Sequence, residues 1–302
     1  MIEVNLEVLA TEKRSEKTMN LDKMSITEIL RIMNEEDAKV PEIISAKLDV
    51  IEKAVSSVIS SFNQGGRLIY IGAGTSGRLG VLDAVECVPT FGTPPEQVQG
   101  IIAGGEQAFI KAVEGAEDSE ELAIVDLKKI HLSDKDTVIG IAASGRTPYV
   151  ISALSFANQI GASTVAIACN QNSLIGKEAD VKIEIEVGPE VLTGSTRLKA
   201  GTAQKLVLNM ISTASMIGIG KVYKNLMVDV LATNLKLVER SKKIIMEATD
   251  CGYHEAEAAL SEADGSVKTA IIMLLTGLTK EDAIRKLAKN KGFVRNTLNG
   301  GV

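Results

Sequence analysis

Short apolar runs and amphipathic stretches alternate along the middle of the chain. Five runs have the length and composition of buried strands, at 67–71, 98–102, 137–142, 163–168 and 182–187. The stretches between and after them have the apolar spacing of helices, near 77–86, 106–116, 118–129, 148–160 and 201–219. Strands that alternate with helices form a parallel sheet covered by helices on both faces. The pattern therefore predicts an α/β fold with a doubly wound five-stranded parallel sheet.

The segment before the first strand is expected to be helical apart from its polar start. The first twenty residues are polar and aperiodic, and we expect them to form an arm on the surface. Ser25 and Glu28 have the spacing of a capping box, which begins a helix that extends to about Lys39. Pro41 begins a second helix, with apolar residues at helical spacing up to Gly65.

Strand patterns end near Val230, and the rest of the chain is predicted to be helical. A long helix is expected over 231–248, followed by short helices with glycine breaks over 249–302. We therefore expect a division near 245. Residues 1–245 would hold the arm, the first helices and the sheet, and 246–302 a small helical subdomain.

Composition and charge narrow the class of protein. The 302 residues are 45% apolar and 24% charged, which is typical of a globular protein with a full core. Aromatic residues make up 3%, tryptophan is absent and the formal net charge is −6, so a nucleic-acid-binding surface is not expected.

Cysteine usage and hydropathy indicate a cytoplasmic protein. Cys87, Cys169 and Cys251 are widely spaced and form neither a zinc pattern nor a disulfide framework, which suits a reducing compartment. The most apolar long stretch, 205–220, contains Asn209 and other polar residues, so it is expected to be a buried helix rather than a membrane span. The N-terminus has no signal-peptide pattern.

A glycine loop follows the first predicted strand and reads Gly72-Ala73-Gly74-Thr75-Ser76-Gly77. A turn of this kind between a buried strand and a helix points backbone N–H groups and the positive end of the helix dipole at one place. Such a place favours an anion, most often a phosphate. The two hydroxyl groups of the loop would add donors.

Two nucleotide-binding motifs share this spacing and are disfavoured. The glycines satisfy the dinucleotide fingerprint, which also needs an acid at the end of the next strand, but the strand at 98–102 is followed by alanine and glycine. A Walker A loop would need Lys and Ser or Thr where Arg78 and Leu79 stand.

A second loop of the same character follows the third predicted strand. It reads Ala142-Ala143-Ser144-Gly145-Arg146-Thr147. Taken alone it suits an ordinary helix-capping turn. However, ligands of open α/β sheets bind beyond the carboxyl ends of the strands. Two such loops in one sheet therefore favour a shared phosphate site.

The segment 188–205 combines three glycines, four hydroxyl groups, an acid and three cations between a strand and a helix. A connecting loop is often polar, but this density of small and charged residues favours a binding role. The candidate substrate contacts in it are Glu190, Ser195, Arg197 and Lys199.

Candidate acids for proton transfer come from two other places. Glu86 precedes Pro89, where the helix is expected to end, and a carboxylate at a helix C-terminus opposes the dipole. An acid so placed is a candidate general acid or base. Glu114 and Glu117 lie around another expected helix break. The alternative for each is a solvated surface charge, and His131 and His254 are expected at the surface or at a helix cap.

These motifs resemble a known family. The glycine loop and the Ser144–Thr147 loop are similar to those of the sugar isomerase (SIS) domain, which holds phosphosugars. The segment 188–205 resembles a signature shared by the glucokinase regulatory protein and bacterial N-acetylmuramic acid 6-phosphate etherases, and 74–87 and 113–118 resemble the etherase family itself. The resemblance covers nearly the whole chain. Ala142 and Ala143 replace the first two residues of the S-Q-S-G-x-T motif of many isomerases, which argues against a plain isomerase.

The resemblance implies an SIS-type, flavodoxin-like fold. It also implies cleavage of the D-lactyl ether of N-acetylmuramic acid 6-phosphate, by elimination and then hydration, in the recycling of cell-wall amino sugars. The family gives the acid matching Glu86 the role of proton donor, with Glu117 as the second catalytic acid. No cofactor, metal, nucleic acid or membrane is implied. The alternatives are a regulatory protein that senses phosphosugars and a phosphosugar isomerase.

Substrate contacts are assigned to the glycine loops and the nearby cations. The expected phosphate contacts are Gly74, Thr75, Ser76, Ser144, Gly145 and Thr147. The candidate partners for the lactyl carboxylate or the phosphate are Arg78, Arg146, Arg197 and Lys199. Glu86 follows Ser76 by ten positions, about 15 Å along a helix. Either the helix ends early or Glu86 acts in the site of a second subunit, so a homodimer is expected.

Overall fold

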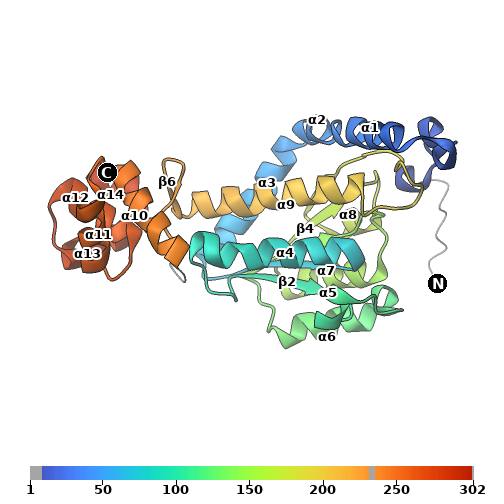
Figure 1. Cartoon of the computed structure of the whole chain (residues 1–302). Helices are drawn as coiled ribbons and strands as arrows, with labels where there is room; N and C mark the ends of the chain where they lie inside the picture. The colour runs from blue at the N-terminus through green and yellow to red at the C-terminus, as the bar shows by residue number, and fades with distance from the viewer. Residues whose placement is uncertain (1–8, 231–234, 301–302) are drawn as a thin grey trace. The chain divides into compact units, whose positions relative to one another are not determined.

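The computed structural model describes residues 9–230 and 235–300 and contains a five-stranded parallel sheet packed between helices (Figure 1). The strand order is β2-β1-β3-β4-β5, the flavodoxin-like order of doubly wound sheets. The predicted fold class is therefore confirmed. The bounds are β1 (Leu68–Gly72), β2 (Val98–Ile102), β3 (Thr137–Ile141), β4 (Ser163–Ala168) and β5 (Val181–Glu184).

Helices cover both faces of the sheet, as its near-continuous apolar strands require. One face packs on α6 (Glu120–Lys129), α7 (Pro148–Ile160) and α8 (Leu174–Glu178). The opposite face carries α3 (Leu48–Asn63) and α4 (Gly74–Phe91). Successive residues of β3 face opposite sides of the sheet, since Gly140 lies against α7 and Ile141 lies against α4. The long helix α9 (Lys199–Gly218) runs beside α4 (Figure 1).

The N-terminal helices confirm one prediction and correct another. Ser25 and Glu28 form the expected capping box of α1 (Ile26–Asp37). The single helix expected from Pro41 is wrong, because the chain forms α2 (Val40–Ser45) and then α3, with a break at Ala46 and Lys47.

The described part of the polar arm, from residue 9 onward, is fixed to the rest of the protein. It forms the 3₁₀ turns η2 (Ala10–Glu12), η3 (Glu16–Thr18) and η4 (Leu21–Lys23). The backbone and hydroxyl of Thr11, a fully buried residue, pair with the carboxamide of Asn170 just beyond β4.

Two helices in the sheet region have different ends from those predicted. We expected Pro89 to end the helix that carries Glu86, but α4 continues through it to Phe91. Glu86 therefore lies inside the helix and not at its C-terminus. The helix expected to reach residue 116 is short, since α5 (Glu106–Ile110) ends six residues earlier. Glu114 lies in the following loop, and Glu117 in the 3₁₀ turn η5 (Ala116–Asp118).

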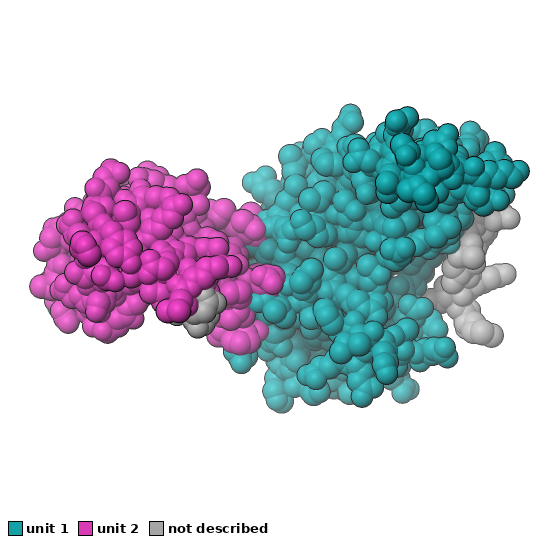
Figure 2. All heavy atoms as spheres, viewed as in Figure 1, with its two compact units in different colours: residues 1–85, 96–212 teal, residues 86–95, 213–302 magenta. Residues whose placement is uncertain are grey.

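Contacts within the chain define two compact units, coloured in Figure 2. The first consists of residues up to 85 and 96–212, and the second of residues 86–95 and from 213 onward. The division expected near 245 falls inside α10 (Leu235–Thr249), which belongs wholly to the second unit.

The second unit is mainly helical, as predicted, with its own core around Ile245, Ala270 and Ile272. Its remaining helices are α11 (Tyr253–Glu262), α12 (Val267–Thr276), α13 (Lys280–Lys289) and α14 (Val294–Leu298). The sequence did not predict its antiparallel hairpin, β6 (Val222–Tyr223) with β7 (Leu226–Met227). Part of the long helix expected from 231 lies outside the described residues. Across 9–230 and 235–300, no helix is both long and apolar enough to cross a membrane.

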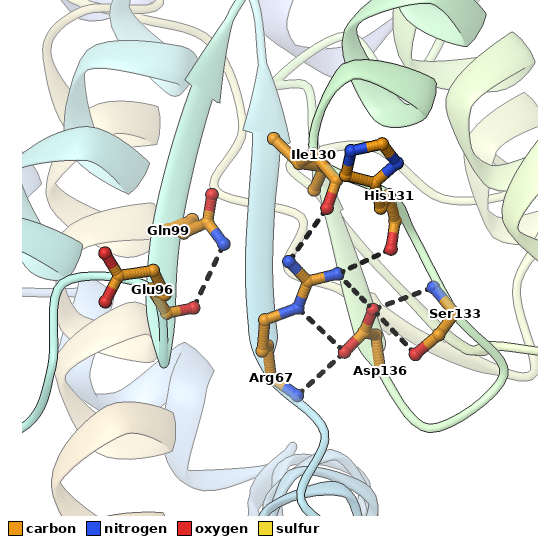
Figure 3. Close-up of polar contacts among 7 residues, drawn as sticks. All are labelled: Arg67, Glu96, Gln99, Ile130, His131, Ser133 and Asp136. Atoms are coloured by element: carbon orange, nitrogen blue, oxygen red, sulfur yellow. Dashed lines mark hydrogen bonds and ion pairs between the residues drawn. The ribbon is translucent and has the colours of Figure 1, made fainter.

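A partly buried ion pair holds the amino-terminal edge of the sheet (Figure 3). The Arg67 guanidinium reaches Asp136 at 2.7 Å and also donates to the carbonyls of Ile130 and His131. Burial of Asp136 would raise its pKa, but the hydrogen bonds from Arg67 and Ser133 outweigh burial and lower it. Arg67 precedes β1 and Asp136 precedes β3, so this clamp sets the register that places their opposite ends together.

Candidate functional site

Three loops leave the carboxyl edge of the sheet at neighbouring positions. Gly72 of β1 is in register with Ile102 of β2 and with Ile141 of β3. The glycine loop, the 103–117 segment and the Ser144 loop therefore begin side by side. This is the edge at which open α/β sheets bind ligands.

The first turn of α4 is an open anion site. The backbone N–H groups of Gly74, Thr75 and Ser76 have no acceptor within the described parts of the chain. The first turn of α4 also contains no acidic side chain. Unpaired N–H groups at the positive end of a helix dipole attract a negative group, so the geometry suits a phosphate.

Glycine is required in this loop by close approach of the backbone. A Cβ on Gly77 would lie 2.7 Å from the Gly72 carbonyl oxygen, closer than any side chain tolerates. In the second loop, Gly145 has a φ of +71°, and a Cβ there would lie 2.4 Å from the Cβ of Ser173. Both loops thus depend on glycine for their shape.

A cavity of about 230 Å³ adjoins the open turn of α4. It is lined by Gly74 and Arg78 on one side and by the 112–117 segment, with Glu114 and Glu117, on the other. The Glu117 side chain is exposed and has no hydrogen-bond partner within 9–230 and 235–300. The structure therefore brings the predicted acid Glu117 to the same cavity as the predicted contacts Gly74 and Arg78.

Arg78 shapes the wall of this cavity. Its Nε donates to the carbonyl oxygen of Phe109 at 2.9 Å, and a terminal nitrogen donates to that of Ala108 at 2.7 Å. These bonds tie α4 to the end of α5. Arg78 still presents positive charge to the cavity, but part of its hydrogen-bonding capacity is used by the protein.

The Ser144 loop offers donors without protein partners. The Ser144 oxygen accepts the N–H of Arg146 at 3.2 Å, and no described residue accepts the hydroxyl proton of Ser144 or Thr147. The Arg146 side chain forms no ion pair in the described chain, and its Nε is buried without a partner. A half-buried guanidinium with no carboxylate beside it is well suited to bind an anion.

Glu190 caps the N-terminus of α9 from inside the protein. Its side chain is fully buried, and its two oxygens accept the backbone N–H groups of Lys199 at 3.0 Å and Ala200 at 2.9 Å. Burial raises the pKa of Glu190 despite these two hydrogen bonds. The start of α9 is therefore already occupied by a carboxylate of the chain, unlike the start of α4.

Lys199 is paired as well. Its buried ammonium contacts Glu36 of α1 at 2.9 Å, and Glu36 also binds Lys39 and Lys17. Glu190 and Lys199 were expected to contact the substrate. In this structure both are used inside the protein, and neither is open to a substrate. Within the same segment, Ser195 is half-buried and Arg197 is exposed.

The lysine cluster around Glu36 predicts a dependence of stability on pH. Burial would raise the pKa of Glu36, but the hydrogen bonds and charges of Lys39 and Lys199 lower it from 4.5 to about 2. The stabilising effect is complete above pH 4.5 and is lost as the pH falls toward 2, because the unfolded chain then takes up the proton first. Between pH 6 and pH 3.5 this carboxylate should account for a loss of about 1 kcal/mol in the free energy of unfolding.

Urea unfolding of the wild type, Glu36→Gln and the exposed neighbour Glu35→Gln, each at both pH values, measures this effect. The loss between pH 6 and pH 3.5 should be smaller in Glu36→Gln and unchanged in Glu35→Gln. An equal loss in all three proteins would contradict the assignment to Glu36.

The fold brings Gln204, which no motif in the sequence marks, to the glycine loop. Its carboxamide oxygen accepts the Ser76 hydroxyl at 3.0 Å, and the side chain is almost fully buried. Gly201, one turn earlier on α9, lies beside Thr75. The position of Gln204 within the 188–205 segment was the only available signal in the sequence.

The remaining predicted residue, Glu86, is exposed and unpaired within the described residues. Because α4 is unbroken from Gly74 to Phe91, Glu86 lies about 15 Å along the helix from Ser76. The early helix end considered from the sequence is therefore excluded.

Comparisons with known proteins agree with this fold. The model of the glucokinase regulatory protein N-terminal SIS domain matches residues 50–158, and the SIS domain model matches residues 114–214. The structure also resembles a phosphoheptose isomerase from Francisella tularensis, with a TM-score of 0.51 over 64% of this chain and all of that one. At 16% identity that likeness concerns the fold alone.

Full-length relatives are much more similar. An N-acetylmuramic acid 6-phosphate etherase from Bacillus cytotoxicus is 66% identical over 97% of this chain and 100% of its own length. The chain belongs to the N-acetylmuramic acid 6-phosphate etherase family. N-acetylmuramic acid 6-phosphate etherase 2 from Enterococcus faecalis is 62% identical over 98% of this chain and 100% of its own. The resemblance inferred from the motifs is therefore confirmed.

Proposed function

We propose that the protein cleaves the lactyl ether of N-acetylmuramic acid 6-phosphate and releases N-acetylglucosamine 6-phosphate and D-lactate. One observation in the structure carries the proposal. An open helix N-terminus suited to a phosphate adjoins a cavity lined by an unpaired carboxylate, Glu117. The identity of 66% over nearly the whole chain to an etherase supports the same activity.

The 6-phosphate would lie at the start of α4. The free N–H groups of Gly74, Thr75 and Ser76 would donate to its oxygens, together with the hydroxyls of Thr75, Ser144 and Thr147. The neighbouring register of β1 and β3 supports this shared role. Gly145 would let the second loop approach closely.

The negative charge of the lactyl carboxylate calls for a positively charged side chain beside it. Arg146 is the strongest candidate, because it has no carboxylate partner within the described chain and part of its guanidinium is buried. Arg78 would add charge at the cavity wall, and the exposed Arg197 and Ser195 would contribute from the 188–205 loop.

The chemistry we propose begins with the open-chain aldehyde of the sugar. The aldehyde acidifies the proton on carbon 2, which a base removes while the bond from carbon 3 to the lactyl oxygen breaks. An acid gives a proton to the departing oxygen, and D-lactate leaves. Water then adds across the new double bond, with hydroxyl to carbon 3 and a proton to carbon 2. Two carboxylates that exchange protons are sufficient for these steps.

We assign these proton transfers to Glu117 and Glu86. Glu117 lies at the cavity, and Glu86 would act as the proton donor. Since Glu86 is about 15 Å along an unbroken helix from Ser76, we propose that it serves the site of a second subunit in a homodimer.

Exposed apolar side chains support the proposed homodimer. Ile26 and Leu30 on α1 are 72% and 61% exposed, and Leu82 and Val85 on α4 are 49% and 60% exposed. A second copy that packs on these side chains would remove their apolar surface from water.

We further propose a cytoplasmic location and a role in the recycling of cell-wall amino sugars. The three cysteines, two of them buried, form no disulfide within the described residues, which suits a reducing compartment. The proposed substrate would be supplied by a reaction that delivers a phosphorylated muramic sugar.

The activity is tested by incubating the purified protein with N-acetylmuramic acid 6-phosphate and assaying D-lactate with an enzyme specific for it. Release of lactate together with N-acetylglucosamine 6-phosphate is expected, and unphosphorylated N-acetylmuramic acid should release almost none. A regulatory protein would bind the phosphosugar without releasing lactate. An isomerase would change the sugar and leave the ether intact.

Ser144→Ala should weaken binding of phosphorylated sugars by about 10- to 150-fold, because a hydrogen bond to a charged group contributes about 1.5–3 kcal/mol. Calorimetric titration with N-acetylglucosamine 6-phosphate measures the loss, and unphosphorylated N-acetylglucosamine is the control. Equal losses for both sugars would place Ser144 outside the phosphate site.

A further inference from the structure

The buried contact between Ser76 and Gln204 leaves one polar group unsatisfied. Ser76 Oγ donates its proton to Gln204 Oε1 at 3.0 Å. Gln204 Nε2 is inaccessible and has no acceptor in the described residues. Ser76 is 7% exposed and Gln204 1% exposed, so bulk water does not satisfy this amide. A buried N–H group without a partner is rare and costs free energy.

In this arrangement the Ser76 hydroxyl proton also points toward Gln204 and not toward an anion at the start of α4. Ser76 lies in the open first turn of α4, where a phosphate needs donors. While its hydroxyl donates to Gln204, it can offer a phosphate only lone pairs, and those repel the phosphate oxygens.

A half-turn of the carboxamide removes both problems. Nε2 then donates to Ser76 Oγ, and the hydroxyl proton becomes free to point into the loop. The oxygen Oε1 takes the unpartnered position, which buried carbonyl groups tolerate better than N–H groups do. Glutamine permits this exchange, because its side chain ends in one acceptor and one donor group of similar shape.

We propose that Gln204 is a positioning residue for phosphate recognition. With a phosphate monoester in the glycine loop, Gln204 Nε2 holds Ser76 Oγ and directs the hydroxyl proton to a phosphate oxygen. This inference rests on the proposed phosphate site and adds a residue that acts on it through Ser76.

The test is a double-mutant cycle on the full-length protein, with N-acetylglucosamine 6-phosphate as the titrated ligand. Gln204→Met removes the amide while keeping its length. It should weaken binding by about 10-fold in the wild-type background and by less than about twofold in Ser76→Ala, where no hydroxyl remains to be directed. Binding of unphosphorylated N-acetylglucosamine should not change.

Gln204→Glu gives a second test with a side chain of the same shape. An ionised carboxylate only accepts, so it holds the Ser76 proton permanently and adds a negative charge near the phosphate. At pH 8 it should weaken binding more than Gln204→Met does. Part of that loss should remain in Ser76→Ala, because the charge acts without the hydroxyl.

The outcomes separate this inference from the proposed site. If Ser76→Ala weakens phosphosugar binding but Gln204→Met has the same effect in both backgrounds, Gln204 does not act through Ser76 and the inference is wrong. If Ser76→Ala changes nothing, the Ser76 hydroxyl does not contact the phosphate and the inference is wrong, while the proposed site, which uses backbone N–H groups and Ser144, is decided by Ser144→Ala. Thermal unfolding of each variant shows whether a loss of binding reflects misfolding. If Gln204→Met is misfolded, the comparison of Gln204→Glu in the wild-type and Ser76→Ala backgrounds decides whether Gln204 acts through Ser76.

Discussion

Glu117→Gln is expected to lower the rate of lactate release by about 10²- to 10⁴-fold, the contribution of a positioned acid or base. The amide keeps the size and hydrogen-bonding reach of the carboxylate but cannot exchange a proton at neutral pH. Affinity for N-acetylglucosamine 6-phosphate should stay within a few-fold, because the proposed phosphate contacts come from α4 and the Ser144 loop and not from η5. The loss should therefore appear in kcat.

Glu114→Gln is the matched control, because Glu114 lines the same cavity three residues away. It removes one negative charge from the same place without removing the proposed catalytic group. We expect a change of only a few-fold. If Glu114→Gln reduced kcat as strongly as Glu117→Gln, the effect would lie in the charge of the cavity and not in proton transfer by Glu117.

Mixed dimers of Glu86→Gln and Glu117→Gln chains should recover activity that both parent proteins lack. Each parent dimer is expected to have lost about 10²- to 10⁴-fold in rate. In a mixed dimer whose sites combine Glu117 of one chain with Glu86 of the other, one site keeps both acids. Co-expression with two different affinity tags isolates the mixed dimer, and lactate release measures its activity.

The reciprocal control places both substitutions on one chain and pairs it with a wild-type chain. If Glu86 acts across the dimer, each site of this control loses one acid and the protein is inactive. If Glu86 acts on its own chain, the wild-type chain remains active and the first mixed dimer stays inactive. A monomer in light scattering that retains full activity would contradict the dimer itself.

The sequence was sufficient for the sheet and for the edge that binds ligands. Parallel strands buried on both faces need near-continuous apolar runs, which mark β1, β3 and β4 clearly, whereas the edge strands β2 and β5 contain polar residues. The turn from β1 into α4 needs glycine because Gly72 and Gly77 approach closely, so the loop is visible as a motif. The resemblance of these motifs to a family then predicted the activity class.

Predictions from local sequence were wrong about the end of one helix and about two short features. Proline inside a helix costs about 3 kcal/mol, and on that basis Pro89 was expected to end α4. The helix continues because residues on both sides of Pro89, Cys87 and Phe91, are buried. The sequence also did not predict the break between α2 and α3 or the β6–β7 hairpin, which are short features with weak periodicity.

The sequence determined which residue types gather at the carboxyl edge of the sheet, but only the tertiary structure decided which of them are free to bind. Lys199 has the pattern of an anion ligand, yet Glu36, distant in the sequence, already pairs with it. Gln204 was not singled out by the pattern, yet it reaches Ser76 across 128 positions. A local pattern records the identity of a side chain, whereas its availability depends on the partner that folding brings to it, and these partners come from distant parts of the chain.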